Sequence, residues 1–179
     1  MDGKRQFLTS GGLGTMGYGL PAAIGASIGN PGNPVICISG DGGAQMNIQE
    51  LATAHALETP VILCIFNNTY LGNVKQMQKM FYNKRYSSTC LRYSRSCNRQ
   101  CRIDGTCTGR DYVPDFVKLA ESYGCTGIRV ENEAQMDEAF KRAAENTKSV
   151  TLIEFMLDCE YDVYPMVPGG AALSDMMFG

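Results

Sequence analysis

The stretch VICISGDGGAQMNIQELATAHALETPVILCIFNN, residues 35–68, decides the fold of this chain. Two apolar runs rich in β-branched side chains, 35–39 and 61–66, are each followed directly by small polar residues. Short continuous runs of this kind predict buried strands. A helical pattern lies between them, and Asn47 with Glu50 three residues later fits a capping box at its start. The order strand, helix, strand predicts two parallel neighbours joined by a right-handed crossover.

The same alternation of strands and helices continues on both sides of this stretch, and no internal repeat is visible. We therefore expect an α/β fold, a doubly wound, mainly parallel sheet with helices on both faces. The expected helices cover residues 20–28, 47–57, 71–81, 115–123 and 136–145, and the expected strands cover 35–39, 61–66, 128–130 and 150–157, with a further short run at 7–9.

Polar groups follow both of the first two strands, and they form the main candidate site. Gly40-Asp41-Gly42-Gly43 closes the first strand, and Asn68 follows 27 residues after Asp41, just beyond the second. Parallel neighbours end at the same sheet edge, where α/β proteins bind ligands. One carboxylate and one amide oxygen suit Mg²⁺, and backbone N–H groups freed by the glycines suit a diphosphate. Either half alone would fit an ordinary turn, but the pair at this spacing favours a metal site.

A glycine-rich segment, GLGTMG at residues 12–17, matches the G-x-G-x-x-G pattern and precedes a helix. A dinucleotide site would also need a clear preceding strand and an acidic residue about 20 positions on. The preceding run is short, and the next acidic residue, Asp41, follows a second strand. The match alone is therefore weak, and the alternative is that the glycines let the backbone approach some other ligand closely.

Composition bounds the class of protein. The chain has 179 residues, 44% of them hydrophobic, and a net charge of -2, as expected for one globular domain. No basic cluster predicts nucleic-acid binding, and no apolar stretch is long enough to span a membrane. The first ten residues lack the apolar core of a signal peptide, so we expect a cytoplasmic protein. Lys75 and Lys79 are expected to be solvated, and the lone His55 is given no role.

The eight cysteines fall into two groups. Four lie singly in apolar runs and are expected to be small buried hydrophobes, namely Cys37, Cys64, Cys125 and Cys159. Four lie in a polar segment of about residues 87–110 that lacks periodicity, namely Cys90, Cys97, Cys101 and Cys107. For this second group a surface loop with unlinked thiols is the first interpretation, and a local knot closed by Zn²⁺ or two disulfides is the alternative.

With these motifs in view, the chain resembles the large subunit of acetolactate synthase, a member of the thiamine-diphosphate-dependent superfamily. G-D-G followed by N-N resembles the superfamily motif for the cofactor. The resemblance covers GGLGTMGYGLPAAIGAS, GDGGAQMNIQELATA, NNTYLGNV, FYNKRYS, PDFVKLAESYG and MVPGGA. It implies a single cofactor-binding domain over residues 1–179, interrupted by a Cys-rich insertion at about 87–110. Gly43 stands where the family often has serine, and Met77 where a tryptophan is usual.

The resemblance also implies roles for particular residues. Asp41, the side chain of Asn68 and the backbone carbonyl of Tyr70 would bind Mg²⁺, and the N–H groups of Gly42 and Gly43 would contact the diphosphate. The remaining residues that would line the cofactor are Gly14, Met16, Gly40, Leu71 and Gly72. The glutamate that activates the cofactor lies on another, N-terminal domain of the family, so no catalytic residue is expected in this chain, and the chain alone is expected to be inactive.

The implied reaction is that of a transferase in branched-chain amino-acid biosynthesis. Pyruvate is decarboxylated, and the two-carbon unit is joined to a second 2-oxo acid, pyruvate or 2-oxobutyrate. The implied partners are a pyrimidine-binding domain of the same or a neighbouring subunit, further copies in a homo-oligomer and a regulatory subunit. FAD would belong to the whole enzyme and not to this domain. The alternatives are another 2-oxo acid decarboxylase or carboligase of the superfamily, and a non-catalytic nucleotide-binding or scaffold domain.

Overall fold

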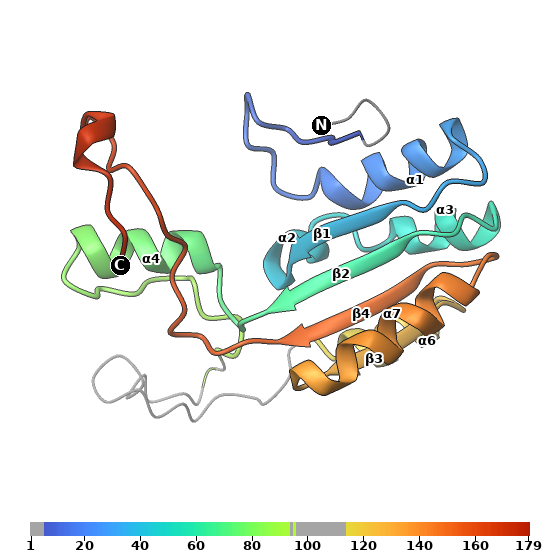
Figure 1. The fold of residues 1–179 in the computed structure, drawn as a ribbon. Helices are drawn as coiled ribbons and strands as arrows, with labels where there is room; N and C mark the ends of the chain where they lie inside the picture. Colours follow the sequence, from blue (N-terminus) through green and yellow to red (C-terminus); the bar gives the residue numbers. More distant parts are fainter. Residues whose placement is uncertain (1–5, 94, 96–113) are drawn as a thin grey trace.

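The computed structural model describes residues 6–93, 95 and 114–179, which contain a four-stranded, wholly parallel sheet (Figure 1). The strands are β1 Ile36–Gly40, β2 Ile62–Asn67, β3 Thr126–Val130 and β4 Thr151–Met156, in the order β1-β2-β4-β3. The helices are α1 Gly19–Gly29, α2 Asp41–Gln45, α3 Glu50–Ala56, α4 Gly72–Phe81, α6 Phe116–Ser122 and α7 Met136–Glu145, with 3₁₀ turns at Glu133–Gln135 and Leu173–Asp175. The predicted α/β fold with a parallel sheet is confirmed.

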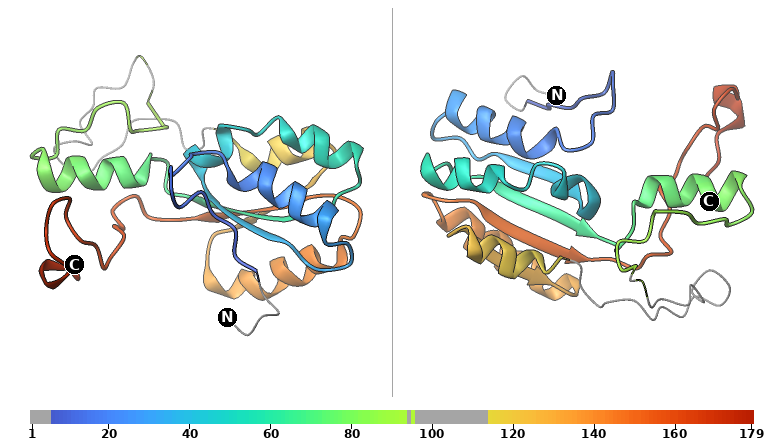
Figure 2. Two further views of the ribbon diagram at one scale, coloured as in Figure 1. Left: turned by 90° about the horizontal axis from the view of Figure 1, so that it is seen from above. Right: turned by 180° about the vertical axis from the view of Figure 1, so that it is seen from behind.

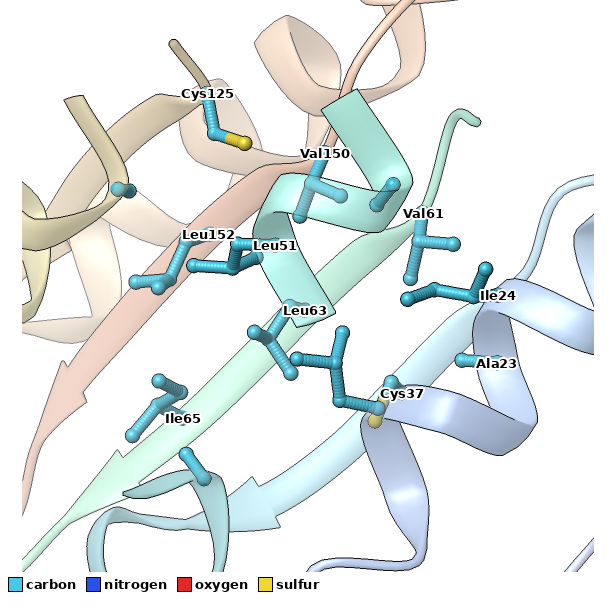
Figure 3. Close-up of a cluster of buried hydrophobic side chains, with 14 of the residues drawn as sticks. Ala23, Ile24, Cys37, Leu51, Val61, Leu63, Ile65, Cys125, Val150 and Leu152 are labelled. Carbon is cyan, nitrogen blue, oxygen red and sulfur yellow. The ribbon is translucent and has the colours of Figure 1, made fainter. Parts of the chain in front are cut away.

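Helices lie on both faces of the sheet, because alternate residues of each strand point to opposite faces. On one face α1, α3 and α6 pack over Leu63 and Ile65 of β2 and over Val61, which precedes the strand (Figure 3). On the other face α7 packs over β3 and β4, where Ile128 and Ile153 are buried (Figure 2). Apolar side chains occupy both faces of β2 and β4, which explains why their sequences read as continuous apolar runs.

Strand β1 is covered on one face only. Cys37 is buried against α1, whereas Ile36 and Ile38 are 55% and 69% exposed on the face that α7 covers farther along the sheet. The prediction of helices on both faces therefore holds for the sheet but not for its β1 edge. An uncovered pair of isoleucines on a strand is an apolar surface suited to contact with another domain or chain.

Two local predictions are wrong. Asn47 does not cap α3, because its side-chain amide donates to the Gly17 carbonyl at 3.0 Å and so ties the glycine-rich segment to the helix. The Glu50 carboxylate accepts instead from the Thr53 hydroxyl at 2.8 Å. Residues 7–9 form no strand.

The glycine at position 17 is required, because its φ is +96° and an added Cβ would lie 2.6 Å from Met46 Cβ.

Helix α4 and the chain after β4 extend beyond the carboxyl ends of the strands and lie next to each other (Figures 1 and 2). Gln76 joins them, donating to the Val163 carbonyl at 2.9 Å and accepting from the Val163 N–H at 3.0 Å. This pair of elements forms one side of the cavity described below. No helix in the described part of the chain is both long and apolar enough to cross a membrane.

The cysteines in the apolar runs behave largely as predicted. Cys37, Cys64 and Cys125 are buried free thiols, and burial raises the pKa of Cys37 to about 11. Cys159 is only half-buried. Of the second group, Cys90 is a half-buried free thiol. The other three, Cys97, Cys101 and Cys107, lie outside the described residues.

Candidate functional site

A cavity of about 370 Å³ opens at the carboxyl ends of β1 and β2. The strand register pairs Gly40 with Phe66, so the residues that follow the two strands emerge side by side. All three predicted metal-binding residues, Asp41, Asn68 and Tyr70, line this one cavity. The full lining comprises Gly40, Asp41, Phe66, Asn68, Tyr70, Gly72, Asn73, Leu157, Asp158, Tyr161, Asp162 and Val163.

Asp41 is the first residue of α2 and is 2% exposed. Its Oδ1 accepts from the Gly42 N–H at 2.8 Å, but its Oδ2 is buried and has no hydrogen-bond partner among the described residues. Burial raises the pKa of this carboxyl to about 6, although the backbone N–H groups of Gly42 and Thr69 act in the opposite direction. A buried carboxylate oxygen without a partner is costly, and a cation at the cavity would satisfy it.

The loop after β2 turns sharply at Thr69, whose φ of +62° is unusual for a β-branched residue. Asn67 and Asn68 both stabilise this turn: Asn67 Oδ1 accepts from the Thr69 N–H at 3.0 Å, and Asn68 Oδ1 accepts from the Tyr70 N–H at 3.1 Å. Farther along the chain, the Leu91 N–H donates to the Thr69 carbonyl at 2.9 Å. The loop that carries Asn68 and Tyr70 is therefore held in a defined, strained conformation.

Gly42, the residue after Asp41, allows the start of α2 to lie close to the segments that carry Met16 and Leu71. A Cβ added at Gly42 would lie 2.4 Å from Leu71 Cδ2 and 3.0 Å from Met16 Cε. Met16 and Leu71, both predicted to line the cofactor, therefore contact the start of α2. Gly43 faces the Ser39 hydroxyl, and Gly72 faces the Asn68 amide. Gly14 is exposed with φ +60° and has no heavy atom near its Cβ position, so the structure does not bring it into contact with the others.

The glycine-rich turn after β1 is helical, which the sequence did not suggest. Gly42 and Gly43 form the first turn of α2, a five-residue helix, and Gly40 precedes it with extended backbone. The N–H groups of a first helical turn have no intrahelical acceptors, although that of Gly42 donates to Asp41 Oδ1 at 2.8 Å in this structure. The predicted role of these glycines toward a diphosphate is therefore retained as a proposal, with a helix start in place of a loose turn.

The opposite wall of the cavity was missed by sequence reasoning. It consists of residues after β4, among them Asp158 and Tyr161. Lys75 of α4 is only 3% exposed; its Nζ bonds to the Glu160 carboxylate at 2.8 Å and lies 4.8 Å from the centre of the Tyr70 ring. Lys79 pairs with Asp162 at 2.6 Å. The prediction that Lys75 and Lys79 are solvated is wrong for Lys75, and both lysines anchor this wall.

A second feature that sequence reasoning missed is Glu154, a fully buried charged residue within the apolar β4 strand. Its Oε1 accepts from Asn67 Nδ2 at 2.6 Å, and its Oε2 accepts from Arg129 Nε at 2.8 Å. The signal was present in the sequence as one carboxylate inside the apolar run 150–157. A buried charge in a strand requires partners, and it marks a polar network.

These observations define a class of protein: a parallel α/β domain with a cavity at the carboxyl ends of its strands, lined by a buried carboxylate and an asparagine. The family described as thiamine pyrophosphate enzyme, C-terminal TPP binding domain, matches residues 1–155. The chain belongs to this family and is a thiamine-diphosphate-binding domain.

Comparison with individual proteins narrows the relationship. The chain is 43% identical over 97% of its length to the probable acetolactate synthase large subunit of Methanococcus aeolicus, covering 25% of that protein. It is 39% identical over 98% of its length to the acetolactate synthase isozyme 3 large subunit of Escherichia coli K12, covering 28%. The chain thus spans about a quarter of the length of these relatives, and the resemblance inferred from its motifs is confirmed.

A solved structure shows the same fold. The thiamine diphosphate-dependent 4-hydroxybenzoylformate decarboxylase of Rhodococcus jostii RHA1 superposes on 80% of this chain with a TM-score of 0.64 and 30% sequence identity, and the chain covers 23% of that protein. The match supports the α/β assignment independently of the sequence motifs.

Proposed function

We propose that this chain is the Mg²⁺- and thiamine-diphosphate-binding domain of an acetolactate synthase. The observation that carries the proposal is the unpartnered Oδ2 of Asp41, which is buried on the same cavity as Asn68 and Tyr70. Asp41, the Asn68 side chain and the Tyr70 backbone carbonyl would hold Mg²⁺, which accepts few protein oxygens and fills its remaining positions with phosphate and water.

The remaining residues around Asp41 would bind the organic part and the phosphates of the cofactor. The N–H groups of Gly42 and Gly43 would contact the diphosphate, and Met16 and Leu71 would supply apolar surface next to it. When bound, thiamine diphosphate supplies the electron sink for decarboxylation of a 2-oxo acid. The residues of this chain position the cofactor and exclude water from its diphosphate end, and the activating glutamate is assigned to another domain.

The proposed reaction joins the two-carbon unit of pyruvate to a second pyruvate or to 2-oxobutyrate, in a cytoplasmic enzyme of branched-chain amino-acid synthesis. Residues 1–179 would act as one domain, with the insertion at about 87–110. The exposed β1 face at Ile36 and Ile38 supports contact with a pyrimidine-binding domain or a second copy in a homo-oligomer. A regulatory subunit and FAD would belong to the whole enzyme.

Two experiments test the proposal. Calorimetric titration of the chain with thiamine diphosphate, with and without Mg²⁺, should show binding that requires the metal. Equal binding in both conditions would instead support a nucleotide-binding or scaffold domain. The chain should form no acetolactate alone, and should release CO₂ from pyruvate when combined with the N-terminal domains of an acetolactate synthase large subunit. A different product in the combined assay would favour another decarboxylase or carboligase.

A further inference from the structure

A buried chain of polar contacts runs from the far edge of the sheet to the loop after β2. It begins at Asp115, the N-cap of α6, whose Oδ1 accepts from the Arg129 guanidinium at 2.8 Å. Arg129 on β3 and Glu154 on β4 are register partners, joined at 2.8 Å. Glu154 accepts from Asn67 at the end of β2 at 2.6 Å. Each step crosses to a neighbouring element, so the chain links three strands and one helix.

The last step of this chain reaches the metal-binding loop. Asn67 uses its amide nitrogen on Glu154 and its amide oxygen on the Thr69 N–H, at 3.0 Å. These two bonds determine the orientation of the amide. In a flipped amide the oxygen would face the Glu154 carboxylate and the nitrogen would face the Thr69 N–H, so neither bond could form. Thr69 has φ +62°, a conformation that its side chain disfavours, so it persists only where neighbouring groups hold it. Asn68 and Tyr70 flank it on the two sides.

We propose that Glu154 is a positioning residue for the metal site: through Asn67 it holds Thr69 in its left-handed conformation and so directs the Asn68 side chain and the Tyr70 carbonyl into the cavity. The inference rests on the proposed function for the identity of the ligand. Glu154 touches neither metal nor cofactor. It acts on the groups that do, as outer partners of metal ligands commonly do.

The burial of the network supports this role over a purely structural one. Glu154 is fully buried and Asn67 is 1% exposed, while the side chains of Arg129 and Asp115 are about a quarter exposed, so water reaches the network from the α6 end. Both carboxylate oxygens of Glu154 are occupied, one by a charged donor and one by the loop asparagine. A glutamine at this position cannot serve both, because its amide nitrogen would face either Asn67 Nδ2 or Arg129 Nε.

The test compares Glu154→Gln with Leu152→Val, a buried apolar control on the same strand whose side chain carries no hydrogen-bonding group. The first readout is Mg²⁺ affinity at saturating thiamine diphosphate, measured by calorimetry. We expect Glu154→Gln to weaken it by about 10- to 100-fold, the range typical of outer-shell changes. Leu152→Val should leave it within about threefold. Equal Mg²⁺ affinities in the two variants would overturn the proposal.

The second readout needs no metal. Hydrogen exchange of the Thr69 amide, followed by NMR in metal-free protein, should accelerate by about tenfold in Glu154→Gln, as expected for loss of one hydrogen bond. The double variant Glu154→Gln with Asn67→Asp should restore slow exchange, because the new amide can donate to the new carboxylate while Arg129 keeps an acceptor. Slow exchange in Glu154→Gln, or fast exchange in the double variant, would contradict the proposed role.

The two readouts separate failure of this inference from failure of the proposed function. If the wild-type chain binds no thiamine diphosphate in a Mg²⁺-dependent way, the function is wrong, and Thr69 exchange still decides the role of Glu154. If Glu154→Gln does not fold, Arg129→Met replaces it, because Arg129 is partly exposed and this variant removes the donors to Glu154 and Asp115 while leaving the Glu154–Asn67 pair in place. That variant should weaken Mg²⁺ binding by about three- to tenfold, and unchanged binding and exchange would overturn the proposal.

Discussion

Two carboxylates are buried near the carboxyl ends of the strands, and they differ in how they are satisfied. Glu154 is fully buried with both oxygens occupied by Asn67 and Arg129. Asp41 is 2% exposed, yet within the described part of the chain its Oδ2 has no hydrogen-bond partner. Proteins rarely leave a buried carboxylate oxygen unsatisfied, because it costs stability. This difference supports our proposals that the satisfied carboxylate positions the site and that the unsatisfied one binds the metal.

The largest expected effect comes from neutralising the unsatisfied carboxylate. Asp41→Asn should weaken Mg²⁺-dependent thiamine diphosphate binding by about 100-fold or more, because the one carboxylate among the proposed ligands is lost. Titration calorimetry measures the change. Asp137→Asn, which alters an exposed carboxylate in the first turn of α7, serves as the control. Retained affinity in Asp41→Asn would remove Asp41 from the metal site.

The next prediction concerns stability without metal, where the two carboxylates should respond in opposite directions. Asp41→Asn should raise the free energy of unfolding by about 1 kcal/mol, since an unpartnered buried charge becomes neutral. Glu154→Gln should lower it by about 2 kcal/mol, since a charged donor loses its acceptor. Urea unfolding of metal-free protein checks both. If both variants changed the free energy of unfolding in the same direction, the contrast between an unsatisfied Asp41 and a satisfied Glu154 would be wrong.

A smaller effect is expected at the neutral metal ligand. Asn68→Ala should weaken Mg²⁺ binding by about tenfold, because an amide oxygen is a weaker ligand than a carboxylate and water can replace it. Asn73→Ala is a matched control, since Asn73 is an exposed asparagine on the wall of the same cavity. An equal loss of Mg²⁺ affinity in both variants would show that the effect comes from the general shape of the cavity and not from a lost metal ligand.

The smallest effect concerns a third, more exposed carboxylate. The hydrogen bond from Lys75 lowers the pKa of Glu160 below its usual value of 4.5. Its carboxylate therefore stabilises the fold above about pH 4.5, and this contribution is lost as pH falls through the lowered pKa. Because its side chain is 64% exposed, the contribution should not exceed about 1 kcal/mol. Unfolding curves of wild type and Glu160→Gln should differ at pH 7 and converge as the pH falls below the lowered pKa of Glu160. A difference that grows toward low pH would contradict this sign.

Much of the fold follows from the sequence because the strands are short apolar runs with clear boundaries. The predicted helix at residues 136–145 matches α7, and the ends of β1 and β2 lie within one residue of prediction. The convergence of Asp41 with the Asn68 loop also follows from sequence, since it requires only a right-handed crossover between parallel neighbours. The ligand roles of these residues stay a prediction.

The remaining features depend on tertiary contacts that no local pattern encodes. Helix α2 contains two glycines, which disfavour helix by about 1 kcal/mol each, so its formation depends on packing against Leu71 and Met16. Asn47 has the composition of a cap but bonds to Gly17, 30 positions earlier in the chain. Lys75 looks like a surface residue until residues 159–160 fold over it.

The cavity wall formed by Asp158, Tyr161 and Asp162 has a consequence for biosynthesis. Together with Leu157 and Val163, these are the cavity-lining residues that are made last, 85 or more positions after Gly72. At ribosomal rates this separation lasts roughly 5 to 15 seconds. During that interval Asp41 and Asn68 have been synthesised but the wall that faces them has not, and Lys75 still lacks its counter-ion Glu160. We therefore expect the cavity to be complete only after β4 and the residues that follow it have been synthesised.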